Sequence, residues 1–161
     1  MSLTDDFKNA LASWASGVSV VTTNQDGMLY GLTVSSFSSL SMDPPLVLVC
    51  LNKANRLPEM IETSGGFAVS ILARTQEEAS NYFASRGREP TQEFTEVEGF
   101  WTESGIPVVE GAAAWIVCEL HQRLDQGDHI IVVGKVLEAV SHDDREPLLY
   151  WRRGYRGVGA D

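Results

Sequence analysis

Apolar and polar positions alternate along most of the chain in short stretches, a pattern typical of β-strands. Residues 18–23, "VSVVTT", predict a strand, and residues 28–36, "MLYGLTVSS", predict its returning partner after the turn-forming "NQDG" at 24–27. Gly31 inside the second strand indicates a bulge or a close approach by backbone or ligand. Residues 45–51, "PLVLVCL", are continuously apolar, which predicts a strand buried on both faces.

The rest of the chain continues the strand pattern. Residues 67–72, "FAVSIL", alternate as one strand. Residues 112–124 and 129–142 alternate on either side of "DQGD", which predicts a long β-hairpin. Residues 147–159, "PLLYWRRGYRGVG", predict a short strand and a basic, aromatic tail. These segments together indicate a mainly β protein.

Helical spacing of apolar residues is found in three short segments, residues 3–17, 55–65 and 75–85. Thr4 is the expected N-cap of the first helix, and Gly17 is expected at its end. Thr75 and Glu78 have the spacing of a capping box at the start of the third. Residues 86–105 are polar and contain Gly and Pro, so a long loop is expected there.

The count is about six or seven strands and two or three short helices, without a regular alternation of the two. This favours an antiparallel barrel with peripheral helices, formed by a single domain of residues 1–161. A Rossmann sheet fits poorly, because no GxGxxG motif follows the first strand.

The formal net charge of -10 argues against nucleic-acid binding, which needs a basic face. The basic residues are unevenly placed, however. Three small groups could meet at one anionic small molecule or lie separately as solvated surface residues: Lys53 with Arg56, Arg86 with Arg88, and Arg152 with Arg153 and Arg156.

Other function classes are disfavoured by the composition. No apolar run approaches the roughly 20 residues that span a bilayer, and the first residues lack a signal-peptide pattern, so a cytoplasmic protein without membrane association is expected. Cys50 and Cys118 lie in apolar runs and are expected to be buried free thiols. Three scattered histidines without a Cys/His spacing pattern predict no metal site.

Small hydroxyl side chains dominate residues 33–41, "TVSSFSSLS", directly before the rigid Pro44 and Pro45. Uncharged donors of this kind can bind a phosphate or the polar edge of a heteroaromatic ring, although serines are also common in ordinary loops. Residues 52–56, "NKANR", stand at the start of a predicted helix, where N–H groups and basic side chains suit a phosphate.

Two further segments can carry chemistry. His129 follows a Gly-Asp turn, so its ring is expected near a barrel rim, where it would hold a ligand or merely satisfy the turn. Tyr150, Trp151 and Tyr155 would stack on a nucleotide or anchor the tail to the core. No GxSxG, HExxH or P-loop motif is present, so an enzyme of this kind would rely on a cofactor for its chemistry.

The order of several motifs resembles the short-chain flavin reductases, the reductase components of two-component flavin monooxygenases such as 4-hydroxyphenylacetate 3-monooxygenase. The matching segments are "WASGVSVVTT", "GLTVSSFSSLSMDPPLVLVCL", "FAVSILARTQEEASNYFA", "GIPVVEGAAAWIVCEL", "QGDHIIVVGKV" and "PLLYWRRGYR". The resemblance covers nearly the whole chain. It implies an antiparallel Greek-key split β-barrel that binds FMN, a homodimer, and reduction of flavin by NAD(P)H.

The resemblance also implies a set of binding residues. Along the isoalloxazine edge it places Thr33, Val34, Ser35, Ser36, Cys50, Leu51 and Asn52. At the flavin phosphate it places Lys53, Asn55 and Arg56, with Phe83, Ala84 and Ser85 bordering the flavin and Arg86 and Arg88 near its phosphate end. His129 is the implied catalytic residue, which positions the nicotinamide, and Tyr155 is implied to approach the nicotinamide face.

The function implied is hydride transfer from NADH to FMN or FAD, with diffusible reduced flavin supplied to a partner monooxygenase. Two alternatives remain: a flavoprotein whose retained flavin reduces another acceptor, such as ferric iron or a corrinoid, and a non-enzymatic flavin-binding protein. The motifs describe the flavin ring and its first phosphate, which FMN and FAD share. No residue in the sequence excludes NADPH.

Overall fold

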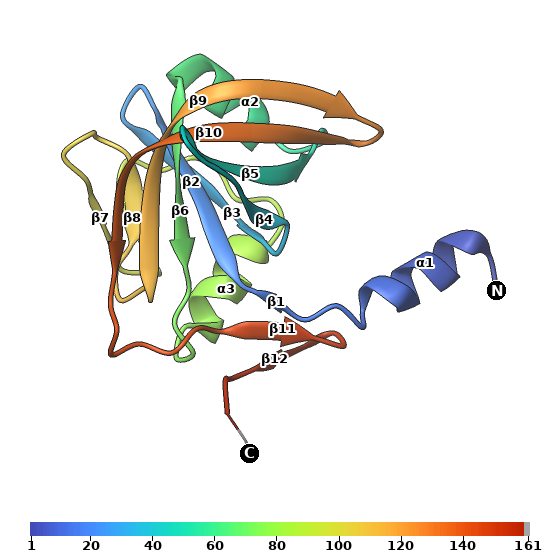
Figure 1. Cartoon of the computed structure of the whole chain (residues 1–161). Coiled ribbons are helices and arrows are strands. Elements are labelled where there is room, and N and C mark those ends of the chain that lie inside the picture. The colour runs from blue at the N-terminus through green and yellow to red at the C-terminus, as the bar shows by residue number, and fades with distance from the viewer. Residues whose placement is uncertain (160–161) are drawn as a thin grey trace.

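A curled antiparallel sheet of seven strands forms the body of the protein, and the computed structural model describes residues 1–159 (Figure 1). The strand order is β3-β2-β6-β9-β10-β5-β4. The bounds are β2 (Ser19–Gln25), β3 (Met28–Val34), β4 (Phe37–Met42), β5 (Pro45–Asn52), β6 (Gly66–Ile71), β9 (Ala114–Gln126) and β10 (His129–Ser141). The two edge strands, β3 and β4, follow each other in the chain but are not paired, so the barrel stays open between them.

Shorter elements surround this sheet. One small sheet combines β1 (Ser16–Gly17), β11 (Leu149–Trp151) and β12 (Gly154–Arg156), and another pairs β7 (Gly99–Trp101) with β8 (Pro107–Val109). The helices are α1 (Leu3–Leu11), α2 (Leu57–Ser64) and α3 (Glu77–Ala84). The three helices, the long hairpin and a short strand within residues 147–159, found as β11, were predicted, whereas β1, β7, β8 and β12 were not. β7 also interrupts the loop expected over residues 86–105.

The interior of the curled sheet is apolar. Side chains from six strands and from α2 form one cluster, which includes Val21, Val49, Phe67, Cys118, Val132, Leu57 and Ile61. Gly134 on β10 leaves room for this packing, since a methyl group at that position would lie 2.5 Å from Phe67 Cζ and 2.6 Å from Cys118 Cβ. Because side chains fill the interior of the barrel, a ligand could bind only at its outer surface or rims.

Helix α3 packs against the outside of the sheet. A second cluster joins Val20 on β2 and Leu72 after β6 to Ala79 and Phe83 on α3. The close approach expected at Gly31 is found here, because a methyl group on Gly31 would lie only 3.3 Å from Phe83 Cδ1 and 2.9 Å from the Val21 carbonyl oxygen. The β2–β3 register is continuous across this point, so no bulge is present.

Strand β5 corrects one prediction. Its burial alternates: Val47, Val49 and Leu51 are buried, while Leu46 and Leu48 are only half-buried. The expectation of burial on both faces was wrong for the single chain, because only one face of β5 meets the core. Strand β2, in contrast, packs against the core on both faces, yet its sequence is no more apolar than that of β5.

The helix caps also differ from prediction. Ser2, not Thr4, caps α1 in a capping box with Asp5, and the helix ends at Leu11 well before Gly17. Gln76 is the N-cap of α3 and makes no side-chain cap hydrogen bond, so the Thr75–Glu78 box does not form. The Gln76 amide is used elsewhere, since Oε1 accepts from the Ala73 N–H at 3.0 Å and Nε2 donates to the Glu110 carbonyl at 2.7 Å.

Helix α1 extends away from the sheet, and none of its residues is buried (Figure 1). The β11–β12 hairpin holds the segment that follows it. Trp151 Nε1 donates to the Ser13 carbonyl at 3.2 Å, and the Arg152 N–H donates to the Ala12 carbonyl at 3.0 Å. None of the helices in the described residues is long and apolar enough to cross a membrane.

Candidate functional site

A cavity of about 510 Å³ lies between the β5–α2 connection and the loop that follows α3. Asn52, Asn55 and Arg56 line one side, residues 84–89 line the other, and Tyr30 contributes from β3. Segments 30 residues apart in sequence therefore face each other here. Arg56 from the first basic group of the sequence thus meets Arg86 and Arg88, the second group, at this cavity, whereas Lys53 does not line it.

The β5–α2 connection is held in shape by its own asparagines. Asn52 Oδ1 accepts from the Ala54 N–H at 2.8 Å, and Asn55 Oδ1 accepts from the Leu57 N–H at 3.2 Å. Such side-chain turns fix a backbone without regular structure. Lys53 is exposed, and its N–H donates to the Asp128 carbonyl at 2.9 Å. The connection is thereby tied to the tip of the β9–β10 hairpin.

Arg56 reaches across the cavity rim to Glu89. Its Nη1 lies 2.7 Å from Glu89 Oε2 and its Nη2 lies 3.1 Å from Glu89 Oε1, so the ion pair is bidentate. This hydrogen bonding raises the pKa of Arg56 above its ordinary value. The Arg56 guanidinium carbon also lies 5.6 Å from the centre of the Tyr30 ring. Tyr30 and Glu89 were not among the predicted site residues.

Arg88 and Arg86 have different environments although they are two residues apart. Arg88 is half-buried, and its Nη2 donates to the carbonyls of Gly31 at 2.6 Å and Phe83 at 2.9 Å. Its guanidinium also lies 5.1–5.3 Å from the ring centres of Tyr30, Tyr82 and Phe83. Arg86 is exposed on the same cavity. Arg88 thus connects α3 to the sheet, while Arg86 is free to reach a ligand.

His129 begins β10 at the rim, as predicted, directly opposite Asn52 in the β5–β10 ladder. Its Nδ1 lies 2.7 Å from Asp128 Oδ1. This hydrogen bond, together with the charge of the histidine, lowers the pKa of Asp128. The Asp128 contact orients the ring, and the strand register brings His129, Asn52 and Lys53 to one edge of the barrel.

Most of the hydroxyl segment lies in strands: Thr33 and Val34 end β3, and only Ser35 and Ser36 lie between β3 and β4. Residues 37–42 form β4, which pairs with β5. Thr33 Oγ1 donates to the Ser80 carbonyl at 2.6 Å, and Ser36 Oγ donates to the Cys50 carbonyl at 2.8 Å and accepts from the Cys50 N–H at 3.2 Å. These two hydroxyls therefore have partners inside the protein. Ser35 is exposed and Val34 is half-buried.

Several predicted residues can face a ligand only in part. The side chains of Leu51 and Phe83 are buried in the two core clusters, so only their backbone could border a ligand. Ala84 and Ser85 are exposed on the cavity. Both cysteines are free, but Cys50 is half-buried, contrary to prediction. Burial raises the pKa of the Cys118 thiol to about 12, which removes it as a nucleophile.

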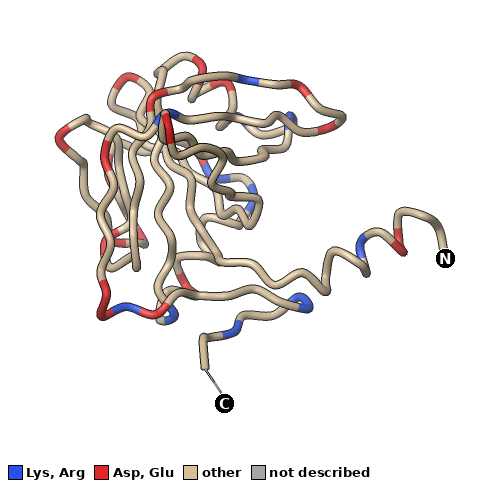
Figure 2. The backbone as a smooth tube through the Cα atoms, in the orientation of Figure 1, with Lys and Arg blue, Asp and Glu red and all other residues tan. Residues whose placement is uncertain are grey.

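The third basic group does not join the first two. Arg152 and Arg153 line a separate cavity of about 540 Å³ with Trp14, Ser35 and Ser36, on the hairpin whose basic turn is visible in Figure 2. The Tyr155 hydroxyl lies 2.7 Å from Ser80 Oγ and 2.9 Å from Asn81 Oδ1. Tyr155 thus anchors the tail to α3, and its approach to a nicotinamide stays a prediction.

Comparisons with known proteins identify the family. The model of the flavin reductase like domain matches residues 11–159. The chain belongs to this family. It is 41% identical over 150 residues to the reductase component of 4-hydroxyphenylacetate 3-monooxygenase from Thermus thermophilus, covering 93% of each protein. It is 37% identical over 157 residues to HsaB, the reductase subunit of a flavin-dependent monooxygenase from Rhodococcus jostii, covering 96% of this chain and 78% of that one.

A solved structure agrees with the sequence relatives. The NADH:FAD oxidoreductase SgcE6 from Streptomyces globisporus, in complex with NAD and FAD fragments, superposes with a TM-score of 0.91 at 31% identity. The match covers 99% of this flavin reductase and 94% of SgcE6. These findings confirm the predicted oxidoreductase and its split β-barrel fold. They do not place a ligand in this chain, so the roles of single residues are proposals.

The environments of Arg88 and Arg86 predict different consequences for stability in this flavin reductase. We expect Arg88→Ala to lower the free energy of unfolding by about 1–3 kcal/mol, because two carbonyls and three aromatic rings lose a partner. Arg86→Ala should leave it unchanged within about 0.5 kcal/mol, since the side chain is exposed. Urea unfolding followed by tryptophan fluorescence measures both. Equal losses would contradict the anchoring role of Arg88.

Proposed function

We propose that this flavin reductase transfers a hydride from NADH to FMN or FAD and releases the reduced flavin to a partner monooxygenase. Support comes from the names of its relatives, two of which are reductase parts of monooxygenases, and from SgcE6, which is named an NADH:FAD oxidoreductase. No residue of the sequence excludes NADPH as the donor. The expected cytoplasmic location stays a prediction.

The observation that carries the proposal is the cavity between the β5–α2 connection and the loop after α3. Its volume of about 510 Å³ lies in the range of small-molecule sites. Basic side chains gather at this cavity in a chain that is otherwise acidic. An anionic group such as a flavin phosphate fits this donor set, with Arg56, Arg86 and Lys53 as its cations and Asn55 beside them.

The remaining proposed contacts lie toward the exposed edge of the barrel. Asn52, Ser35 and the backbone around Cys50 would face the polar edge of the ring. When bound, the flavin accepts the hydride. The protein then needs to hold two flat rings in contact more than it needs an acid or a base. His129, oriented by Asp128 at the rim, would position the nicotinamide.

Anaerobic stopped-flow absorbance tests the proposal directly. We expect mixing with NADH and excess FMN or FAD to bleach the oxidised-flavin band through many turnovers, because the flavin is a diffusible substrate. The faster flavin would identify the preferred one. Bleaching of a single bound equivalent would instead indicate a retained flavin and another acceptor. Flavin binding without bleaching by NADH or NADPH would leave a non-enzymatic binding protein.

Substitution of His129 separates the two substrates. We expect His129→Ala to raise the apparent KM for NADH by about tenfold, since a hydrogen bond to the nicotinamide would be lost. The dissociation constant for flavin should change by less than about twofold. His121→Ala is the matched control, because His121 is exposed farther along β9. An unchanged KM for NADH would remove His129 from this role.

The functional unit is proposed to be a homodimer. An isolated helix of nine residues is marginal in water, yet α1 buries none of its residues in this chain. Its apolar side chains are open to solvent, with Phe7 60% and Leu11 54% exposed. Met42 on β4 is 87% exposed. A second copy of the chain would cover these surfaces and the half-buried face of β5.

Sedimentation velocity tests the dimer. We expect the wild-type protein to sediment as a dimer at micromolar concentration, and Phe7→Glu to raise the dissociation constant by about tenfold or more, because a charge would replace a ring that the proposed interface covers. Leu137→Glu is the control, since Leu137 is 55% exposed on β10, away from α1. A wild-type monomer, or equal effects of both variants, would contradict the proposed interface.

A further inference from the structure

We propose that the Glu89 carboxylate occupies the anion-binding fork of Arg56 when no flavin is bound, and so lowers the affinity of the protein for the flavin phosphate. Glu89 would act as an internal competitor that keeps the flavin exchangeable. This inference rests on the proposed function, because it assumes that Arg56 receives the phosphate. It concerns a residue that the sequence motifs did not single out.

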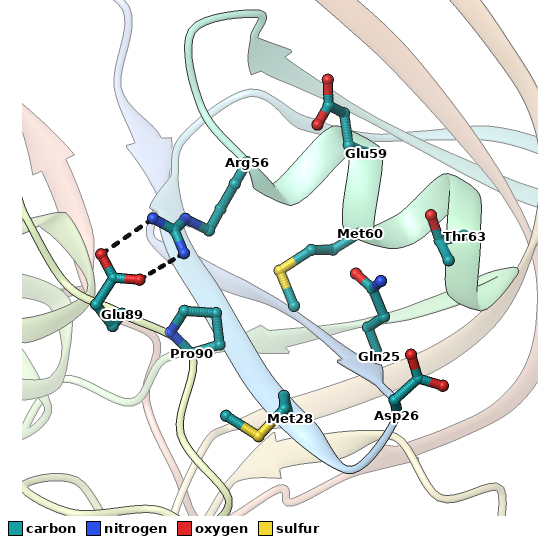
Figure 3. Close-up of a pocket in the computed structure, with 9 residues that line it drawn as sticks. All are labelled: Gln25, Asp26, Met28, Arg56, Glu59, Met60, Thr63, Glu89 and Pro90. Atoms are coloured by element: carbon teal, nitrogen blue, oxygen red, sulfur yellow. Dashed lines mark hydrogen bonds and ion pairs between the residues drawn. The ribbon is translucent and has the colours of Figure 1, made fainter.

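The geometry of the pair carries the argument. Figure 3 shows both carboxylate oxygens of Glu89 facing two nitrogens of Arg56, at 2.7 and 3.1 Å. Carboxylates and phosphates use the same planar fork of an arginine. While Nη1 and Nη2 of Arg56 donate to Glu89, they cannot both donate to a phosphate. Flavin binding through Arg56 therefore requires the carboxylate to be displaced.

The position of Glu89 is fixed by its neighbours in the chain. On one side, the Arg88 side chain donates hydrogen bonds to the carbonyls of Gly31 and Phe83. On the other side, Thr91 forms a two-way backbone bridge to Leu29, with N–H···O distances of 2.6 and 2.9 Å. The backbone at Glu89 is thus held between two attachments to β3. The carboxylate is placed beside Arg56 by the fold rather than by chance.

The charges around the cavity favour competition over simple stabilisation. Glu89 is the single acidic residue among the described residues that line it. The guanidinium of Arg88 is already engaged by carbonyls and rings. Glu89 therefore opposes an incoming anion both by holding Arg56 and by its own charge. The pair is largely exposed, at 43% and 72% of the two side chains, so a phosphate can displace it at modest cost.

The opposite role is also physically reasonable and gives the opposite sign. A carboxylate can hold an arginine in the position that a ligand needs, and its removal then weakens binding. A second cavity, of about 580 Å³, lies on the other side of the Arg56–Glu89 pair and supplies a control for general charge effects. Glu59 lies on the first turn of α2 and lines that cavity together with Arg56 and Glu89 (Figure 3). The ion pair of Arg56 runs to Glu89 and not to Glu59.

Quenching of flavin fluorescence, without NADH, measures the effect. The proteins are wild type, Glu89→Gln and Glu59→Gln, and the ligands are FMN and riboflavin, which lacks the phosphate. We expect Glu89→Gln to lower the dissociation constant of FMN by about fivefold and to leave that of riboflavin unchanged. Glu59→Gln should change neither by more than about twofold.

The other outcomes overturn the inference in distinguishable ways. Weaker FMN binding by Glu89→Gln would make Glu89 an orienting residue for Arg56. Equal gains for FMN and riboflavin would mean that the phosphate is not involved. Wild-type binding of riboflavin and FMN with equal affinity would remove the phosphate site itself. Absence of any flavin binding by the wild type would contradict the proposed function, and this inference would fall with it.

A second pair of variants tests whether Glu89 acts through Arg56. Glu89→Asp retains the charge but shortens the side chain, so it should give a smaller gain in FMN affinity than Glu89→Gln. In an Arg56→Gln background, Glu89→Gln should increase the affinity for FMN less than it does in the wild type, because the guanidinium that Glu89 would release is absent. An undiminished gain in that background would show that Glu89 does not compete for Arg56. Thermal unfolding of each variant confirms that it is folded.

Discussion

The contact between helix α3 and strand β3 determines the shape of the proposed site. Gly31 allows the approach, since Phe83 lies where a larger residue would project. Arg88 then connects the two elements by donating to the carbonyls of Gly31 and Phe83. The chain that leaves α3 is thereby directed toward the β5–α2 connection. Without this contact, residues 84–89 would not face Arg56, and the basic groups would remain on separate surfaces.

The register of β5 with β10 brings in the second set of residues. His129 pairs with Asn52 at the end of the ladder, and Lys53 continues the contact through its N–H to Asp128. A shift of one residue would turn the side chains of β10 to the other face of the sheet. Burial of Ile130 and Val132 in the core opposes such a shift. The core packing of the barrel thus positions a histidine at its rim.

The sequence predicted elements whose signal is local. The long hairpin has alternation on both arms and a turn between them, and it appears as β9 and β10. Strand β4 was missed because its serines have no apolar alternation, and its structure comes from pairing with β5. The burial of β5 was overestimated because an apolar run looks the same whether one or both faces are covered. Neither error could be avoided without knowing the neighbouring strands.

The proposed site was predictable only in part for the same reason. Resemblance to a family supplied the segments, but the role of each side chain depends on what surrounds it. Arg86 and Arg88 are the same residue type two positions apart, yet only Arg88 meets carbonyls and rings. The hydroxyls of Thr33 and Ser36 resemble ligand donors in the sequence, but in the fold they donate hydrogen bonds to the carbonyls of Ser80 and Cys50. Because these partners are distant in sequence, only the fold separates anchoring residues from those that remain available to a flavin.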